Sequence, residues 1–216
     1  MSVSAMLGQL SAGMVTTIVI FVMTLVFSLP LGLLISFGRM SKNLFIRNLA
    51  KIYISIMRGT PLMLQLLVVY FGPYYIFGIA ISSSYRAYAV IIAFAINYAA
   101  YFAEIYRGGI ESMPQGQYEA AKVLGYTKAQ TFVKIIMPQV VKRILPSVTN
   151  EVITLVKDTS LAFSIAYAEM FTIAKAIANS QRSMLPFVAA AVFYYVFNFI
   201  VAALMELWEK KMSYYK

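Results

Sequence analysis

The sequence predicts an all-α membrane protein with five transmembrane helices and a structured cytoplasmic loop of two short helices. The first observation is composition: 61% of the 216 residues are hydrophobic, only 12% are charged, and the mean hydropathy is +0.76. Soluble proteins carry about 25% charged residues. The second observation is that the apolar residues fall into separate stretches of spanning length. Most of the surface is therefore expected to face lipid.

Five apolar stretches account for the spans, since a helix needs about 20 apolar residues to cross a bilayer. We expect them at about residues 14–38, 61–81, 88–105, 144–167 and 185–207. Gly72 and Pro73 lie inside the second stretch and predict a kink or an early end there. The amphipathic stretch 44–57 is expected to extend the second helix into the cytoplasmic interface. We treat residues 1–216 as a single transmembrane domain.

The positive charges predict the orientation. They cluster on one side of the membrane in the segments between spans one and two, between spans three and four, and after span five. The opposite side carries only Arg86, Lys175 and Arg182, and Lys157 falls inside the fourth span. The positive-inside rule then places the N-terminus outside and the C-terminus, with Lys210, Lys211 and Lys216, in the cytoplasm. A cleaved signal peptide is disfavoured because no basic region precedes the first span, which is also too long for one.

The residue inventory argues against enzymatic chemistry on this chain. There are no cysteines and no histidines, which removes disulfides, cysteine nucleophiles, the commonest general base and the commonest metal ligand. A net charge of +10 would suggest nucleic acid as the partner of a soluble protein. In a membrane protein the placement of the charges matters more than their sum, so no nucleic-acid partner and no metal site are expected.

The polar segment between spans three and four, residues 108–138, is predicted to fold rather than merely connect. Residues 117–124 favour a short helix, and Gly125 follows where a helix end requires a positive φ. Thr127 and Gln130 have the spacing of a capping box for a second helix. Pro138 is expected to mark the turn into the fourth span. The adjacent small residues Ala120 and Ala121, beside Glu119, suggest a surface on which a partner docks.

This segment resembles the EAA loop of binding-protein-dependent ABC importers. The pattern matches at Glu119, Ala120, Ala121, Gly125, Ile135 and Pro138, and departs at Met137, where the family usually has leucine. Three further segments resemble the branch that imports polar amino acids. They begin at Arg58 (RGTPL), Tyr101 (YFAEIYRGGI) and Lys157 (KDTSL).

The resemblance implies a type I ABC importer permease fold in the cytoplasmic membrane. It implies that the loop couples to a separate ABC ATPase, which binds ATP and Mg²⁺, and that this chain carries no cofactor. It also implies a second permease subunit, identical or different, and an extracytoplasmic amino-acid-binding protein. The absence of a GxxxxGK[ST] loop agrees with a separate source of energy.

Two polar stripes are candidate substrate-binding surfaces, because charge at membrane depth is costly and usually functional. On the fourth span Ser147, Glu151, Thr154 and Asp158 share one helical face bordered by Asn150, with Glu151 near the bilayer midplane. On the third span Asn97, Tyr101 and Glu104 share a face, with Tyr98 beside them. The alternative is that these groups only hold helices together. Glu104, one turn from Arg107, is expected to form such a structural pair.

A midplane carboxylate favours a cation, so arginine, lysine or histidine is the first substrate hypothesis. Glutamine or another neutral polar amino acid is the alternative. A secondary transporter is disfavoured because the chain shows no internal repeat, and a channel because it has no filter motif such as TVGYG. A passive membrane anchor would not need midplane polar stripes.

Overall fold

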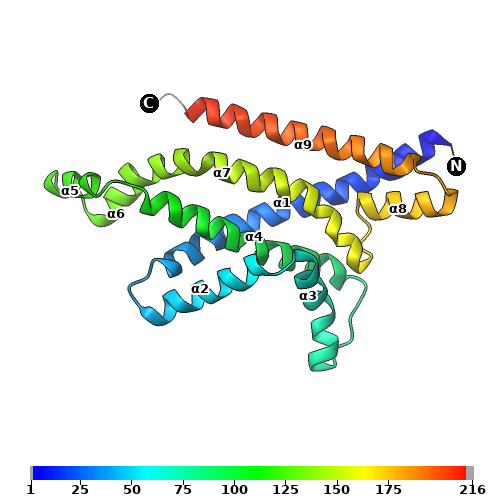
Figure 1. The fold of residues 1–216 in the computed structure, drawn as a ribbon, viewed down its shortest axis with the longest axis horizontal. Helices are drawn as coiled ribbons and strands as arrows, with labels where there is room; N and C mark the ends of the chain where they lie inside the picture. The colour runs from blue at the N-terminus through cyan, green and yellow to red at the C-terminus, as the bar shows by residue number, and fades with distance from the viewer. Residues whose placement is uncertain (1, 213–216) are drawn as a thin grey trace.

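A bundle of long helices forms the core of the protein, which we describe from a computed structural model over residues 2–212. The elements run in this order: α1 Val3–Arg39, α2 Leu44–Gly59, α3 Leu62–Phe77, α4 Tyr85–Glu111, α5 Gln115–Val123, α6 Lys128–Thr131, a π-helical turn Phe132–Ile136, α7 Met137–Asp158, a 3₁₀ segment Thr159–Ile165, α8 Met170–Gln181 and α9 Leu185–Met212. Helices α1, α7 and α9 run lengthwise through the molecule (Figure 1). The described ends of the chain lie at opposite ends of the bundle, and α5 and α6 lie at the end where α9 finishes (Figure 1).

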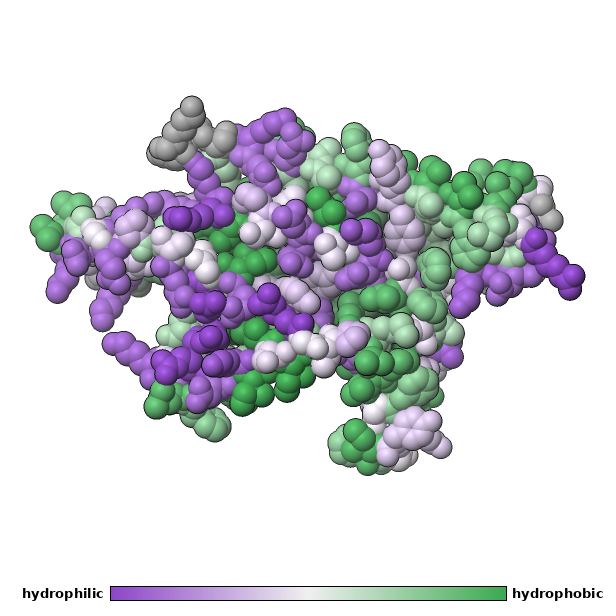
Figure 2. Space-filling model, in the orientation of Figure 1, coloured by the Kyte–Doolittle hydropathy of each residue, from purple (hydrophilic) through white to green (hydrophobic). Residues whose placement is uncertain are grey.

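The membrane-spanning pattern agrees with the sequence prediction. Three helices, α1, α4 and α9, are each long and apolar enough to cross a membrane. Two pairs of helices, each bent at a short break, add at most two more spans. One pair is α2 with α3, and the other is the helical run 128–165 with α8. The fold is therefore all-helical, with five spans if each bent pair counts as one. Figure 2 shows hydrophilic side chains gathered at the end that holds α5 and α6.

The second span departs from the prediction. Instead of a straight extension by residues 44–57, α2 meets α3 at a bend of 108°. The sharp break lies at Thr60 and Pro61. Helix α3 continues through Pro73 but ends at Phe77, before residue 81, so of the two outcomes expected from Gly72 and Pro73 the early end is the one observed. Thr60 is extended, with φ −124° and ψ 147°, as expected for a residue before proline. Pro61 also lacks the N–H that would continue α2.

The fourth span also differs from the prediction at both ends. The chain does not turn at Pro138; it runs from α6 through the π-helical turn into α7, with Pro138 in the first turn of that helix. A proline is tolerated at the start of a helix, where its missing N–H is not needed. At the far end α8 forms from residues that sequence analysis left as an outer loop.

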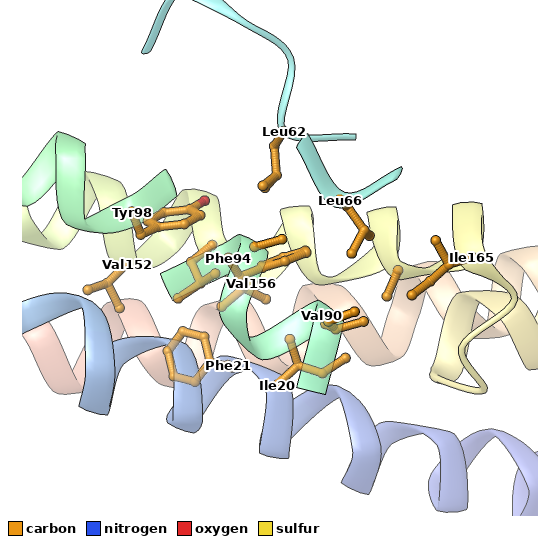
Figure 3. Close-up of a cluster of buried hydrophobic side chains, with 14 of the residues drawn as sticks. Ile20, Phe21, Leu62, Leu66, Val90, Phe94, Tyr98, Val152, Val156 and Ile165 are labelled. Atoms are coloured by element: carbon orange, nitrogen blue, oxygen red, sulfur yellow. The ribbon is translucent and has the colours of Figure 1, made fainter. Parts of the chain in front are cut away.

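The largest buried cluster joins α1, α3, α4, α7, the 3₁₀ segment and α9 near the middle of the bundle. Figure 3 shows side chains from α1, α3, α4 and α7 converging there, with Phe94 and Tyr98 of α4 between the other helices. Phe94 is 0% exposed and Tyr98 is 2% exposed. Helix α4 thus lies at the centre of the bundle, packed against α1, α3 and α7.

Glu169 is a fully buried carboxylate that the sequence analysis overlooked. It caps α8: its two oxygens accept from the backbone N–H groups of Phe171 and Thr172, both at 2.7 Å. The hydroxyls of Thr172 and Tyr194 also donate to it, at 2.8 and 3.0 Å. These donors explain how a charge-bearing group is accommodated inside the bundle.

Removing this cap is expected to destabilise the protein. Glu169→Ala leaves two partly buried backbone donors unpaired, so we expect a loss of about 3 kcal/mol of folding free energy. The thermal unfolding midpoint of the purified protein in detergent should fall by several degrees. Glu206→Ala is the control, because that carboxylate is exposed and forms only an exposed pair with Lys210 at 2.7 Å, which contributes about 0–1 kcal/mol. Equal midpoints for the two variants would contradict the structural role of Glu169.

Candidate functional site

The loop between spans three and four folds as the sequence predicts, into two short helices with a sharp turn between them. Gly125 adopts φ 79°, and the backbone N–H groups of Gly125 and Tyr126 donate to the carbonyls of Lys122 and Ala121, at 3.1 and 3.0 Å. This is the two-bond pattern that ends a helix at a left-handed residue. Thr127 and Gln130 form the capping box that opens α6. The turn is therefore fixed by local hydrogen bonds.

The loop is tied firmly to the spans on either side. The side-chain amides of Gln117 in α5 and Gln139 in α7 exchange two hydrogen bonds of 2.8 Å. Gly109 near the end of α4 lies against α7 so closely that an added Cβ would come within 3.1 Å of Val140. Tyr118 of α5 packs against a buried cluster formed by Met113, Ile136, Val140 and Ile144. This partial burial raises the pKa of its hydroxyl above the ordinary value. Movement of the loop would therefore be transmitted to α4 and α7.

The exposed surface of the loop differs in one respect from the prediction. Ala121 is only 1% exposed, so its small side chain serves packing within the protein and is not itself a docking surface. Glu119, Ala120 and Pro138 are exposed. The most prominent apolar side chains are Val123 and Leu124 just before the turn, 87% and 73% exposed. The sequence analysis did not identify Val123 and Leu124 as candidate docking residues, because the EAA motif directs attention to the small residues beside them.

The polar stripe of α7 lies on the surface of the chain at mid-span. The helical run from Met137 to Ile165 is centred on Glu151, which is half-buried together with Asp158. The remaining members of the face, Ser147, Asn150 and Thr154, are exposed. In Figure 2 hydrophilic residues also cross the middle of the visible face, over α7. A polar face at this depth needs either water or a protein partner beside it.

The two stripes meet at one point. The Tyr98 hydroxyl of α4 donates to the Asp158 carboxylate of α7 at 2.7 Å. Tyr98 is buried, and its ring fills the space between the two helices. This hydrogen bond orients Asp158.

Tyr101 faces a cation that the sequence analysis placed in the segment between spans one and two. The Arg58 guanidinium, at the end of α2, lies 5.3 Å from the centroid of the Tyr101 ring. It is also near enough to Glu151 for electrostatic attraction. Arg58 could not be assigned to this site from sequence, because its position depends on the bend between α2 and α3.

Asn97 lies on the same helix but in a different environment. It is 4% exposed, and its amide nitrogen donates to the Met57 carbonyl at 3.1 Å and to the Gln65 side-chain oxygen at 2.9 Å. The Gln65 amide nitrogen donates in turn to the Met57 and Thr60 carbonyls at 3.0 and 3.1 Å. Asn97 therefore holds the break in the second span, and a role of its side chain toward substrate stays a prediction.

The other charged residues near the stripes have separate surroundings. Glu104 pairs with Arg107 at 2.6 Å and with Arg39 at 3.7 Å, which confirms the expected structural pair. Lys157 makes no ion pair within residues 2–212. It lines a surface cavity of about 320 Å³ between the fourth and fifth spans, with Ser160, Phe171, Phe187, Ala190, Ala191 and Tyr194.

No group of three or more metal-ligating side chains occurs within the described part of the chain.

Comparisons with known proteins agree with the resemblance seen in the motifs. The family model for the binding-protein-dependent transport system inner membrane component matches residues 28–214. The octopine transport system permease protein OccM of Rhizobium radiobacter is 38% identical over 215 residues, covering 95% of this chain and 88% of that protein. The L-cystine transport system permease protein TcyB of Bacillus subtilis is 33% identical over 208 residues, covering 95% and 87%. A solved amino acid ABC transporter, crystallised with histidines, matches with a TM-score of 0.85 at 33% identity, covering 94% of each chain.

Proposed function

Because the chain belongs to the family of binding-protein-dependent transport system inner membrane components, we propose that it imports polar amino acids with a preference for basic side chains. The coarser assignment, a membrane-embedded permease of an amino acid ABC importer, follows from the family and from the relatives that cover almost the whole chain. The observation that carries the finer proposal is the exposed face of α7 with Glu151 at its centre. A carboxylate in the path attracts a cationic side chain and disfavours an anionic one.

A neutral polar amino acid is the second candidate substrate. One relative is named for cystine and another for octopine, so the comparisons do not single out arginine or lysine. The proximity of Arg58 to Glu151 also offsets part of the negative field. Uptake of a panel of labelled amino acids into proteoliposomes containing the permease and its ATPase ranks the two candidates. The proposal of a basic preference requires arginine or lysine to rank above glutamine.

Energy is proposed to come from a separate ABC ATPase that binds ATP and Mg²⁺ and docks on the loop formed by α5 and α6. The exposed Val123 and Leu124 and the rigid links of this loop to α4 and α7 support that role. The loop lies at the same end of the bundle as the end of α9 (Figure 1), which suits a cytoplasmic C-terminus and an outer N-terminus. Uptake should therefore survive loss of the proton gradient but not loss of ATP, whereas a secondary transporter would behave in the opposite way.

Two permease subunits are expected in the working complex, together with two ATPase subunits and an extracytoplasmic amino-acid-binding protein. The exposed polar face of α7 supports this, because a second copy or a related subunit would shield it from lipid and complete a path between the two. We expect native mass spectrometry of the detergent-purified complex to show two permease subunits of 24.2 kDa, or one such subunit with a relative. A complex with a single permease would be incompatible with this assembly.

A further inference from the structure

Arg58 is a cation held at the level of the middle of α4, without a counter-ion in direct contact. It ends α2 beside the break in the second span. That break is pinned to Asn97, which lies near the middle of α4. The side chain is exposed, and no ion pair within residues 2–212 includes it.

The surroundings hold this guanidinium in place without neutralising it. Its contact with the Tyr101 ring is a cation–π interaction, which stabilises the cation but leaves its N–H donors free for another acceptor. Glu151 and Glu104 both attract it electrostatically, but Glu104 is already paired with Arg107 and Arg39. A fixed, unpaired arginine at this depth is costly unless it binds something.

The positions of the charges match the two ends of an amino acid. Every α-amino acid at neutral pH carries a carboxylate and an ammonium group close together. Arg58 offers a planar fork of N–H donors suited to a carboxylate. The carboxylates of Glu151 and Asp158 lie on α7, and Glu151 is near enough to attract the guanidinium. Tyr101 orients the guanidinium, and Tyr98 orients Asp158. The site therefore has a cationic side contributed by α2 and an anionic side contributed by α7.

We propose that Arg58 binds the α-carboxylate of the transported amino acid, while Asp158 binds its α-ammonium group and Glu151 binds a cationic side chain. This inference rests on the proposed function and extends it from side-chain preference to recognition of the amino acid backbone. It also explains the break in the second span. The bend brings Arg58, at the end of α2, beside Tyr101, whereas a continuous helix would place Arg58 away from that ring. Arg58 then acts on all substrates alike, whereas Glu151 discriminates between them.

Equilibrium binding to the permease–ATPase complex in lipid nanodiscs tests the proposal without the external binding protein. The ligands are arginine, glutamine and agmatine, which is arginine without its carboxylate. Arg58→Gln should weaken the binding of arginine and the binding of glutamine by a similar factor of about ten, which corresponds to about 1.4 kcal/mol. It should leave agmatine unchanged or bound more tightly, because a repelling charge has been removed. Arg58→Lys keeps the charge and should recover part of the affinity for both amino acids.

The controls separate a failure of this inference from a failure of the proposed function. Arg47→Gln removes a charge about three turns earlier on α2 and should bind all three ligands like the wild type. If Arg58→Gln binds both amino acids normally, or weakens agmatine as much as arginine, Arg58 is a structural residue and the inference is wrong. If the wild-type complex binds neither arginine nor glutamine, the proposed function itself fails. If Arg58→Gln does not fold, two other measurements decide the question: the binding affinities of Arg58→Lys, and the ratio of the arginine affinity to the agmatine affinity in the wild type. A wild-type affinity ratio near one excludes a carboxylate subsite.

Discussion

Replacing Gly125 by aspartate is expected to abolish substrate-stimulated ATP hydrolysis while leaving membrane insertion intact. An added Cβ at Gly125 meets nothing within 4 Å of it in this chain, so the substitution strains the backbone at this positive φ but causes no clash. Aspartate is among the residues that tolerate a positive φ best. The defect is therefore expected at the interface with the ATPase, where a charge would be placed next to the apolar side chains of Val123 and Leu124.

The matched control for this prediction is Gly78→Asp. Gly78 also has a positive φ, 67°, and open space around it, but it follows α3 outside the loop. The two variants thus share the backbone strain and the added charge and differ only in position. Both are reconstituted with the ATPase in liposomes, and hydrolysis is measured with and without substrate and binding protein. Normal coupling in Gly125→Asp, or an equal defect in Gly78→Asp, would remove the assignment of this turn to docking.

Neutralising Glu151 is expected to lower transport of arginine and lysine by about tenfold or more, as a loss of roughly 1.4 kcal/mol would give. A carboxylate attracts a cation several ångströms away by a few kcal/mol in a medium of intermediate dielectric. Glu151→Gln preserves the shape of the side chain and removes this attraction. The variant also leaves the positive charge of Arg58 less compensated, which acts in the same direction. A neutral amino acid should be affected much less.

Folding is the confounding factor for Glu151→Gln, because the half-buried carboxylate attracts Arg58 across the helices. Basal ATP hydrolysis and thermal stability are therefore measured on the same preparation as uptake. Glu206→Gln, which makes the same chemical change at an exposed site on α9, should transport like the wild type. Wild-type uptake of basic amino acids by Glu151→Gln would mean that the carboxylate is structural, and the basic preference would lose its main support.

Local sequence determined those features that depend on neighbouring residues. The turn at Gly125 and the capping box at Thr127 appear as predicted because each is closed by hydrogen bonds within a few residues. The Glu104–Arg107 pair was predictable for the same reason, since residues three apart on a helix face each other. The spans were predictable because lipid requires long apolar helices whatever their packing.

Tertiary structure decided everything that depends on contacts between distant segments. The bend before Pro61 has a local cause, but its stabilisation by Asn97 and Gln65 joins residues that lie 32 positions apart. That bend places Arg58 beside Tyr101. The residue pattern within α2 or within α4 does not predict this contact. Ala121 and Glu169 are buried for the same kind of reason, because burial depends on which helices pack around a residue. The sequence by itself thus determined the family, the helices and their caps, whereas only the packing of broken helices around α4 decided which charges face one another.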